Sequence, residues 1–218
     1  MDLIIKNGTI VSPTATFKAD VCVDNGKIVA ITADAGTDAD KVVDASGKMV
    51  LPGAIDAHTH LAMPFGGTIS SDDYYAGTRA AACGGTTTVF DFILQDFGET
   101  MVDAIKRRDA LCAPDAAVDY AFHVAVKDVS NGLIDTIEDA VNYGVSSFKV
   151  FMVYDFGVTD GVFYKVLEKA KSCLRRYDLG TRREQAVNRR SDRALSVRGQ
   201  DKRMVSLYEP SGICRGRG

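Results

Sequence analysis

The pattern of apolar and polar positions divides the chain into two kinds of structure. Over residues 1–50, short β-branched clusters alternate with polar breaks that contain glycine, which is typical of strands joined by tight turns. Residues 24–27, Asp-Asn-Gly-Lys, lie between two such clusters, and an Asn-Gly pair tolerates the positive φ angles of a two-residue hairpin turn. We therefore predict a small all-β segment over residues 1–50.

From residue 54 onward, apolar runs of strand length alternate with helical patterns, as expected for βα units around a parallel sheet. The predicted strands cover residues 53–57, 86–92, 118–125 and 147–152. The predicted helices cover residues 71–83, 99–111, 133–143 and 161–171. Four successive units suit half of an eight-stranded barrel better than a complete domain. A doubly wound sheet is the alternative, although no G-x-G-x-x-G motif follows the first strand.

The charge and the periodicity both change near residue 173. Residues 1–172 contain 11 Lys, 3 Arg and 24 acidic residues, a formal charge of −10, whereas residues 173–218 contain 1 Lys, 11 Arg and 5 acidic residues, a formal charge of +7. We interpret residues 173–218 as an Arg-rich tail without packed structure, translated out of frame, with a genuine basic appendage as the alternative. Its acidic residues and few aromatic residues argue against nucleic-acid binding.

Length and composition exclude several classes of protein. A chain of 218 residues with 46% hydrophobic residues can bury a core, which excludes a wholly disordered or collagen-like chain. The sequence has no apolar run of eighteen residues, and its start lacks the pattern of a secretory signal. The five cysteines form no C-x-x-C pair, so neither a disulfide framework nor a thiolate zinc site is indicated. We expect a cytoplasmic protein that binds neither membranes nor nucleic acid.

Two of the three histidines, His58 and His60, directly follow the first predicted barrel strand. Alternate residues of an extended strand point to the same face, and barrel enzymes place their active sites at the carboxyl ends of the strands. Imidazole is a good ligand for zinc and similar cations, so the pair is a plausible half of a metal site. The alternative is a histidine pair without a ligand, because so short a motif often occurs by chance.

Lys149 lies in an otherwise apolar run that is predicted to be a buried strand. A buried lone ammonium is costly, so the group would favour the neutral amine, and an amine near a metal ion can add carbon dioxide to become an anionic carbamate ligand. The alternative is that Lys149 reaches the surface or pairs with a carboxylate. We interpret His123 as a structural histidine with satisfied hydrogen bonds, and Asp91 as a residue of no assigned role that could face the barrel mouth.

Three motifs in order give the chain its resemblance to a known family. They are Pro-Gly-Ala-Ile-Asp-Ala-His-Thr-His-Leu at residues 52–61, Gly-Gly-Thr-Thr-Thr at 84–88 and Phe-Lys-Val-Phe-Met at 148–152. Together they resemble the cyclic-amide hydrolases of the amidohydrolase superfamily, with D-hydantoinases and dihydropyrimidinases as the nearest members. The resemblance implies a metal-dependent (β/α)₈ barrel joined to a small β-sandwich. In this chain, residues 1–50 would form the N-terminal segment of the sandwich and residues 51–172 the first half of the barrel. It also implies a homotetramer.

The resemblance further implies roles for individual residues. His58 and His60 would bind the more buried metal ion, and Lys149 would be the carboxylated lysine that bridges two divalent cations, usually zinc. Tyr154 would be the catalytic and substrate-binding tyrosine that stabilises the oxyanion. The side chains that would line the pocket for the exocyclic group of the substrate are Met63, Phe65 and Phe151.

The sequence also departs from the family pattern. No histidine follows His123, so the two further histidine ligands and the later catalytic aspartate that the resemblance implies do not appear. We therefore expect the chain to be an incomplete form, with poor solubility and hydrolysis near zero. The function predicted for the family site is the opening of a hydantoin or dihydropyrimidine ring to an N-carbamoyl amino acid. The alternatives are a non-catalytic dihydropyrimidinase-like interaction protein and an allantoinase-type or dihydroorotase-type hydrolase.

Overall fold

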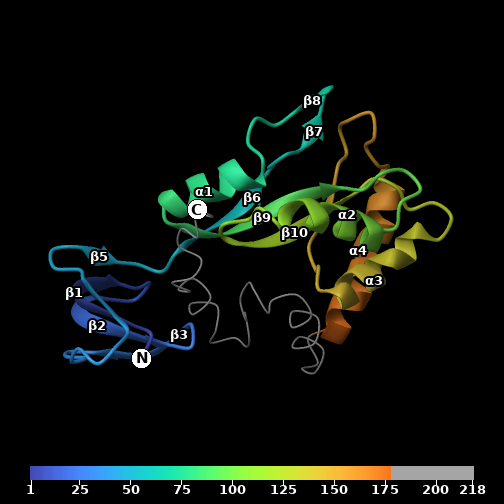
Figure 1. The fold of residues 1–218 in the computed structure, drawn as a ribbon. Coiled ribbons are helices and arrows are strands. Elements are labelled where there is room, and N and C mark those ends of the chain that lie inside the picture. Colours follow the sequence, from blue (N-terminus) through green and yellow to red (C-terminus); the bar gives the residue numbers. More distant parts are fainter. Residues whose placement is uncertain (178–218) are drawn as a thin grey trace.

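The structure is a computed structural model that describes residues 1–177. The first part is a five-stranded sheet in which β1 is central: β2 pairs with it antiparallel, while β4 and β5 pair with it parallel, and β3 extends the sheet beyond β2. Figure 1 shows this sheet in blue, at one end of the molecule. The strands are β1 (Leu3–Val11), β2 (Thr16–Asp24), β3 (Lys27–Thr32), β4 (Lys41–Asp44) and β5 (Met49–Val50).

The predicted hairpin turn joins β2 to β3. Asn25 and Gly26 have φ angles of 50° and 68°, and Asp24 pairs with Lys27 across the turn. Positive φ at both central residues matches the twist of the two strands, which explains why Asn and Gly occupy these positions. The prediction of an all-β N-terminal segment is confirmed.

The second part is a four-stranded parallel sheet whose spatial order follows the order along the chain. The strands are β6 (Ala54–Thr59), β9 (Thr86–Leu94), β10 (Asp119–Val126) and β11 (Phe148–Val150), with neighbours in that sequence. In a doubly wound sheet the order of strands reverses, so that later strands lie on the other side of the first one. In a barrel, each new strand lies beside the preceding one. The sheet therefore has the topology of a partial barrel, and the doubly wound alternative is wrong.

Helices connect these strands and cover the sheet (Figure 1). Helix α1 contacts β9, helix α2 contacts β9 and β10, and α3 lies against both α2 and α4. The buried residues of α2 follow helical spacing from Met101 to Cys112, and the apolar ones among them pack with Ile93 and Val124 of the sheet in the main hydrophobic core. The helices are α1 (Tyr74–Cys83), α2 (Met101–Cys112), α3 (Thr136–Tyr143), which follows a short 3₁₀ turn (Leu133–Asp135), and α4 (Asp160–Tyr177).

The observed bounds differ from the predicted ones for local reasons. Helix α1 begins three residues later than predicted because the Asp73 side chain caps it, accepting a hydrogen bond from the Ala76 N–H at 2.7 Å. Thr100 caps α2 in the same way. Strand β11 has only three residues, since within the described chain it pairs with β10 alone and over only that length. A small hairpin, β7 (Pro64–Phe65) with β8 (Thr68–Ile69), projects beyond the sheet (Figure 1).

The proposed tail lies almost wholly outside the described residues. Helix α4 runs on to Tyr177, so its last turn includes the first residues of the segment assigned to the tail. Residues 178–218, with the proposals of a frame shift or a basic appendage, lie beyond the part that the structure describes. Among residues 1–177, no helix is both long and apolar enough to cross a membrane.

Candidate metal centre and substrate site

His58 and His60 converge at the carboxyl end of β6. Their Nε2 atoms lie 3.2 Å apart, and the rings meet edge to face with centroids 4.9 Å apart. The pairing of β6 with β9 is irregular between Asp56 and Thr59, and the Asp56 carboxylate accepts a hydrogen bond from the His58 N–H at 3.1 Å. The strand is therefore not a regular extended ladder here, yet the two imidazoles meet as the alternation of side chains predicted.

The spacing of the two nitrogens suits a shared cation. Two imidazoles bound to the same tetrahedral zinc ion, with zinc–nitrogen distances of about 2.0–2.1 Å, would have their nitrogens about 3.3–3.4 Å apart, close to the observed separation. Burial, followed by the neighbouring His58 and the Lys149 ammonium, lowers the pKa of His60. A lower pKa favours the neutral imidazole, which is the form that binds metal ions.

Lys149 reaches the same face from β11, two strands away from β9 in the sheet. Its Nζ atom lies 4.3 Å from the centroid of the Phe92 ring. The same ring lies 4.5 Å from the His58 ring and 5.0 Å from the His60 ring, centroid to centroid. Phe92, which no motif in the sequence indicated, is thus the common contact of the three residues expected to hold metal.

The donor set fits a metal site only when lysine is included. Within residues 1–177, no group of three or more His, Cys, Asp and Glu side chains is placed to hold a metal ion. Catalytic zinc commonly has three protein ligands, and a carboxylated Lys149 would add anionic oxygens to the two imidazoles. The residues present therefore fit a divalent cation as a partial ligand set.

His123 has the structural role expected of it. Its Nδ1 lies 2.6 Å from the Ser147 hydroxyl oxygen and its Nε2 lies 3.0 Å from the Ala57 carbonyl oxygen. Both ring nitrogens are therefore engaged within the protein, and the Nε2 contact supports the backbone just before His58.

Three of the four residues predicted to bind substrate, Phe65, Phe151 and Tyr154, form an aromatic group beside the β7–β8 hairpin. The Phe65 and Tyr154 rings lie 5.5 Å apart and the Phe151 and Tyr154 rings 5.3 Å apart, each pair edge to face. Phe65 is 46% exposed and Tyr154 47% exposed, whereas Met63 is buried. In the described part of the chain, the ring contacts of Tyr154 are with phenylalanines and not with the histidines.

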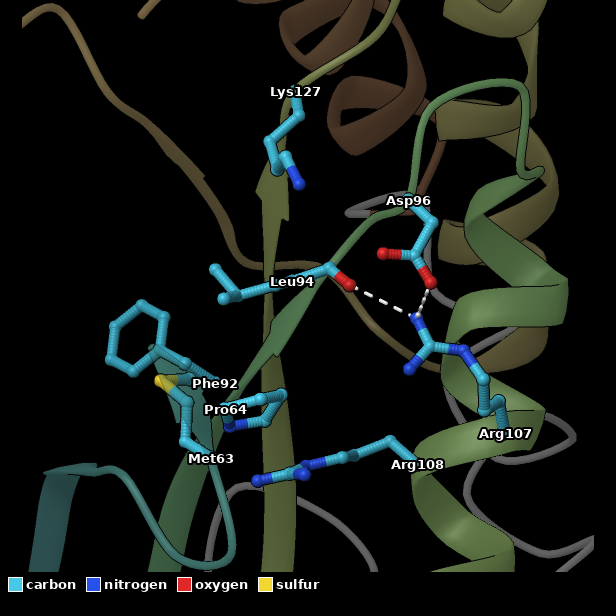
Figure 2. A pocket seen from close by; sticks show the side chains of 8 residues that line it. All are labelled: Met63, Pro64, Phe92, Leu94, Asp96, Arg107, Arg108 and Lys127. Atoms are coloured by element: carbon cyan, nitrogen blue, oxygen red, sulfur yellow. Dashed lines mark hydrogen bonds and ion pairs between the residues drawn. The ribbon is translucent and has the colours of Figure 1, made fainter. Parts of the chain in front are cut away.

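A cavity of about 190 Å³ opens beside this region (Figure 2). Met63, which belongs to the predicted site, and Phe92, which contacts the expected metal ligands, both line this cavity. Three of the four charged residues that line it are cationic. Arg107 is engaged by the Leu94 carbonyl oxygen and by Asp96. The lining residues are Met63, Pro64, Phe92, Leu94, Asp96, Arg107, Arg108 and Lys127.

Asp91 does not face the barrel mouth, which corrects the sequence-based expectation. It is fully buried on the helix side of β9, where its carboxylate binds the Arg108 guanidinium at 2.8 Å and accepts a hydrogen bond from the Tyr74 hydroxyl at 2.5 Å. The sequence offered one signal, an acidic residue inside the apolar run of residues 89–94. Nothing in it indicated the partners.

Comparison with known proteins identifies the family. The sequence profile described as "Amidohydrolase family" matches residues 49–179. The D-hydantoinase of Geobacillus stearothermophilus is 42% identical over 174 residues, covering 78% of this chain and 37% of that protein. The dihydropyrimidinase of Dictyostelium discoideum is 40% identical over 173 residues, covering 78% and 34%.

Solved structures show the same relationship. The dihydropyrimidinase from Brevibacillus agri NCHU1002 is 44% identical and superposes with a TM-score of 0.76, covering 79% of this chain and 38% of that one. The chain thus spans a little over a third of the length of the relatives that it matches. By the profile match over most of its length, the chain belongs to the amidohydrolase family.

Proposed function

We propose that this site serves metal-dependent opening of a five- or six-membered cyclic amide to an N-carbamoyl amino acid. The observation that supports it most is the 3.2 Å approach of the His58 and His60 Nε2 atoms, with Lys149 on the same aromatic ring. The similar proteins named D-hydantoinase and dihydropyrimidinase indicate the substrate class, a hydantoin or a dihydropyrimidine.

In this proposal His58 and His60 hold one of two divalent cations, of which zinc is the first choice. Reaction of the Lys149 amine with carbon dioxide would form an N–C bond and release one proton, and the carbamate would then supply anionic oxygen ligands to the cations. Bound cations would acidify a water molecule and polarise the ring carbonyl, since water is a poor nucleophile and a ring amide a poor electrophile. The Phe92 ring contacts the side chains of His58, His60 and Lys149 and so supports their arrangement.

The aromatic group then binds the substrate. The Tyr154 hydroxyl donates a hydrogen bond to the carbonyl oxygen as negative charge develops there, a contribution of about 3–4 kcal/mol for a donor of this kind. Met63, Phe65 and Phe151 receive an apolar exocyclic group, and Phe65 and Tyr154 are each about half exposed and so accessible to a ligand. A homotetramer stays a prediction of the family resemblance, and a cytoplasmic location stays a prediction of the sequence pattern.

A ring with an anionic substituent, as in dihydroorotase-type hydrolases, is the second candidate. One observation favours it: the cavity beside Met63 and Phe92 is also lined by Lys127, whose ammonium lies over the Phe97 and Phe156 rings at 5.0 and 5.2 Å. The apolar side chains of the aromatic group favour the uncharged substituent instead. Comparing hydantoin with dihydroorotate as substrates separates the two candidates.

A transplant tests the proposal without requiring this chain to supply a whole barrel. Residues 1–177 would replace the corresponding segment of the Geobacillus D-hydantoinase, and ring opening of hydantoin and dihydrouracil would be measured with Zn²⁺ present. We expect hydrolysis that falls at least 100-fold in His60→Asn, and a carbamate signal in ¹³C NMR after incubation with labelled bicarbonate. Arg79→Lys in the same chimera, at an exposed arginine of α1 that binds the Tyr75 hydroxyl, is the control and should retain activity.

A folded, zinc-loaded chimera that opens none of the cyclic amides would contradict the proposal. Equal activity of the chimera and its His60→Asn variant would contradict the assigned metal ligand. Absence of the carbamate signal in an active chimera would remove Lys149 from the ligand set.

A further inference from the structure

A buried ion pair lies directly behind His60, on the helix side of the parallel sheet. Asp91 of β9 is fully buried and Arg108 of α2 is 5% exposed, and the Arg108 Nη2 atom lies 2.8 Å from the Asp91 Oδ2 atom. Burying two charges is costly unless each finds further hydrogen bonds. The remaining partners of this pair therefore show what it does in the fold.

The Asp91 carboxylate binds both sequence neighbours of His60. Its Oδ1 atom accepts hydrogen bonds from the Leu61 N–H at 3.0 Å and from the Thr59 hydroxyl at 3.2 Å. Its Oδ2 atom accepts from Arg108 and from the Tyr74 hydroxyl. Burial and then the Asp91 charge raise the pKa of Tyr74, which keeps that hydroxyl protonated as a donor.

The Arg108 guanidinium binds the chain immediately after His60. Its Nη1 atom donates to the Ala62 carbonyl oxygen at 3.0 Å, and its Nη2 atom donates to the Leu61 carbonyl oxygen. Ala62 has a φ of 45°, an unfavourable region for a residue with a side chain, and such a conformation persists where the surroundings fix it. Arg108 fixes it from one side, and the Asp72 carbonyl oxygen accepts from the Ala62 N–H at 2.7 Å.

We infer that the Asp91–Arg108 ion pair positions His60 for metal binding by fixing the backbone that follows it and the Thr59 side chain that precedes it. The inference rests on the proposed function, because it takes His60 to be a metal ligand. Neither residue touches the metal site itself, so both are positioning residues. The rigid planar fork of arginine is needed to bind two carbonyl oxygens and a carboxylate together, which a lysine ammonium cannot reproduce.

The test is Co²⁺ binding to the 218-residue chain, followed by its visible absorption bands. Arg108→Lys keeps the charge but loses the fork, and Arg107→Lys makes the same change one residue earlier, where the partners are Asp96, Glu99 and the Leu94 carbonyl oxygen. We expect Arg108→Lys to weaken Co²⁺ binding 10- to 100-fold and to change the band intensities, as loss of supporting contacts around metal ligands commonly does. Arg107→Lys should bind Co²⁺ as the wild type does.

Two further measurements separate positioning from general destabilisation. Ile137→Val, in the same hydrophobic core but away from the loop, should lower stability without weakening Co²⁺ binding. In the metal-free protein, the imidazole NMR signals of His60 should shift in Arg108→Lys and stay unchanged in Arg107→Lys. If Arg108→Lys does not fold, Tyr74→Phe, which removes a single hydrogen bond to Asp91, should weaken binding about threefold to tenfold.

The outcomes distinguish the inference from the function on which it rests. A folded wild-type chain that binds no Co²⁺ would overturn the proposed metal site, and the inference with it. A wild type that binds Co²⁺, with Arg108→Lys or Tyr74→Phe unchanged in affinity, bands and His60 signals, would overturn the inference alone.

Discussion

The side chain of Leu61 lies against Gly77 so closely that a Cβ placed on Gly77 would be 2.4 Å from the Leu61 Cδ2 atom. Gly77 is in the middle of α1, and Leu61 belongs to the loop that follows His60. The absence of a side chain at this helical position lets α1 approach the loop. The contact adds a side-chain anchor to the backbone contacts of Asp91 and Arg108.

We predict that Gly77→Ala destabilises the protein although alanine is the better helix former. The new methyl group must displace Leu61, and overpacking of this kind costs about 1–3 kcal/mol. Gly161→Ala in α4 is the matched control, because no atom lies within 4 Å of the added Cβ. It should leave stability unchanged or raise it by up to about 1 kcal/mol. Urea unfolding of both variants measures the difference, and equal stabilities would contradict the packing argument.

We predict that replacing Phe92 weakens metal binding more than replacing Phe90, which lies two residues earlier on the same strand. Its ring contacts both candidate histidine ligands and Lys149, so Phe92→Leu should loosen their arrangement and weaken Zn²⁺ binding about tenfold. Phe90→Leu is the control, since the Phe90 ring stacks on His123 at 5.3 Å. Isothermal titration with Zn²⁺ tests this, and an equal effect of the two changes would show that Phe92 has no special role.

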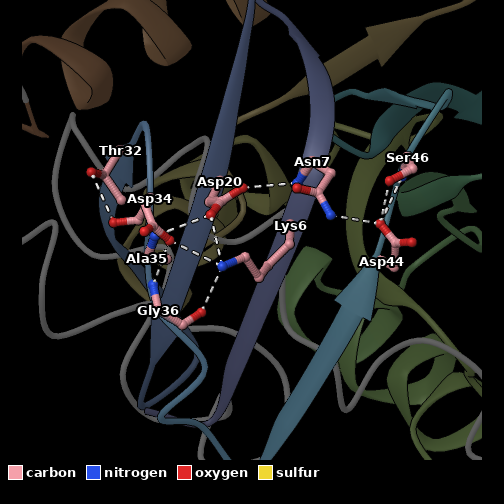
Figure 3. Close-up of polar contacts among 9 residues, drawn as sticks. All are labelled: Lys6, Asn7, Asp20, Thr32, Asp34, Ala35, Gly36, Asp44 and Ser46. Atoms are coloured by element: carbon pink, nitrogen blue, oxygen red, sulfur yellow. Dashed lines mark hydrogen bonds and ion pairs between the residues drawn. The ribbon is translucent and has the colours of Figure 1, made fainter.

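Asp20 holds together the N-terminal sheet and the loop after β3 (Figure 3). Its carboxylate accepts hydrogen bonds from the Asn7 N–H at 2.8 Å and the Ala35 N–H at 3.0 Å, and Lys6 lies 3.6 Å away. These contacts, the Asn7 hydrogen bond first, hold the pKa of Asp20 below its usual value. Asp34 also binds Lys6, but its side chain is 80% exposed.

Asp20→Asn should therefore cost about 1–3 kcal/mol near neutral pH, because an amide cannot accept from all these donors. A lowered carboxyl pKa stabilises the fold above the usual pKa, and that stabilisation disappears as the pH falls through the folded-state value. The variant should accordingly lose less stability than the wild type between about pH 5 and pH 2. Asp34→Asn should change little, and thermal unfolding curves for both variants across this range would show whether it does.

The sequence predicted the order and type of the elements well, because the signals were local. Asn25 and Gly26 specified a hairpin turn, and the alternation of strand and helix patterns specified the order of β6, β9, β10 and β11. The convergence of His58 and His60 followed from two-residue spacing, despite an irregular strand. Short-range periodicity and turn chemistry were sufficient for each of these.

The buried ion pair could not be predicted in this way. Asp91 lies in a strand with apolar residues on both faces, so alternation alone did not say which face it joins. Arg108 reaches Leu61 across 47 positions of the sequence, a contact that only the packed helix and sheet create. The expected poor solubility also stays a prediction, to which the structure adds that β6 and β11 are the edge strands of the described parallel sheet.

The most direct test of the metal centre is zinc X-ray absorption on the 218-residue chain and on His58→Asn and His60→Asn. The chain has three histidines, and His123 is engaged at both ring nitrogens. With one zinc ion bound per chain, we predict two imidazole nitrogens at about 2.0–2.1 Å from zinc in the wild type and one in each variant. A zinc spectrum without imidazole scattering, or one that neither substitution changes, would contradict the account.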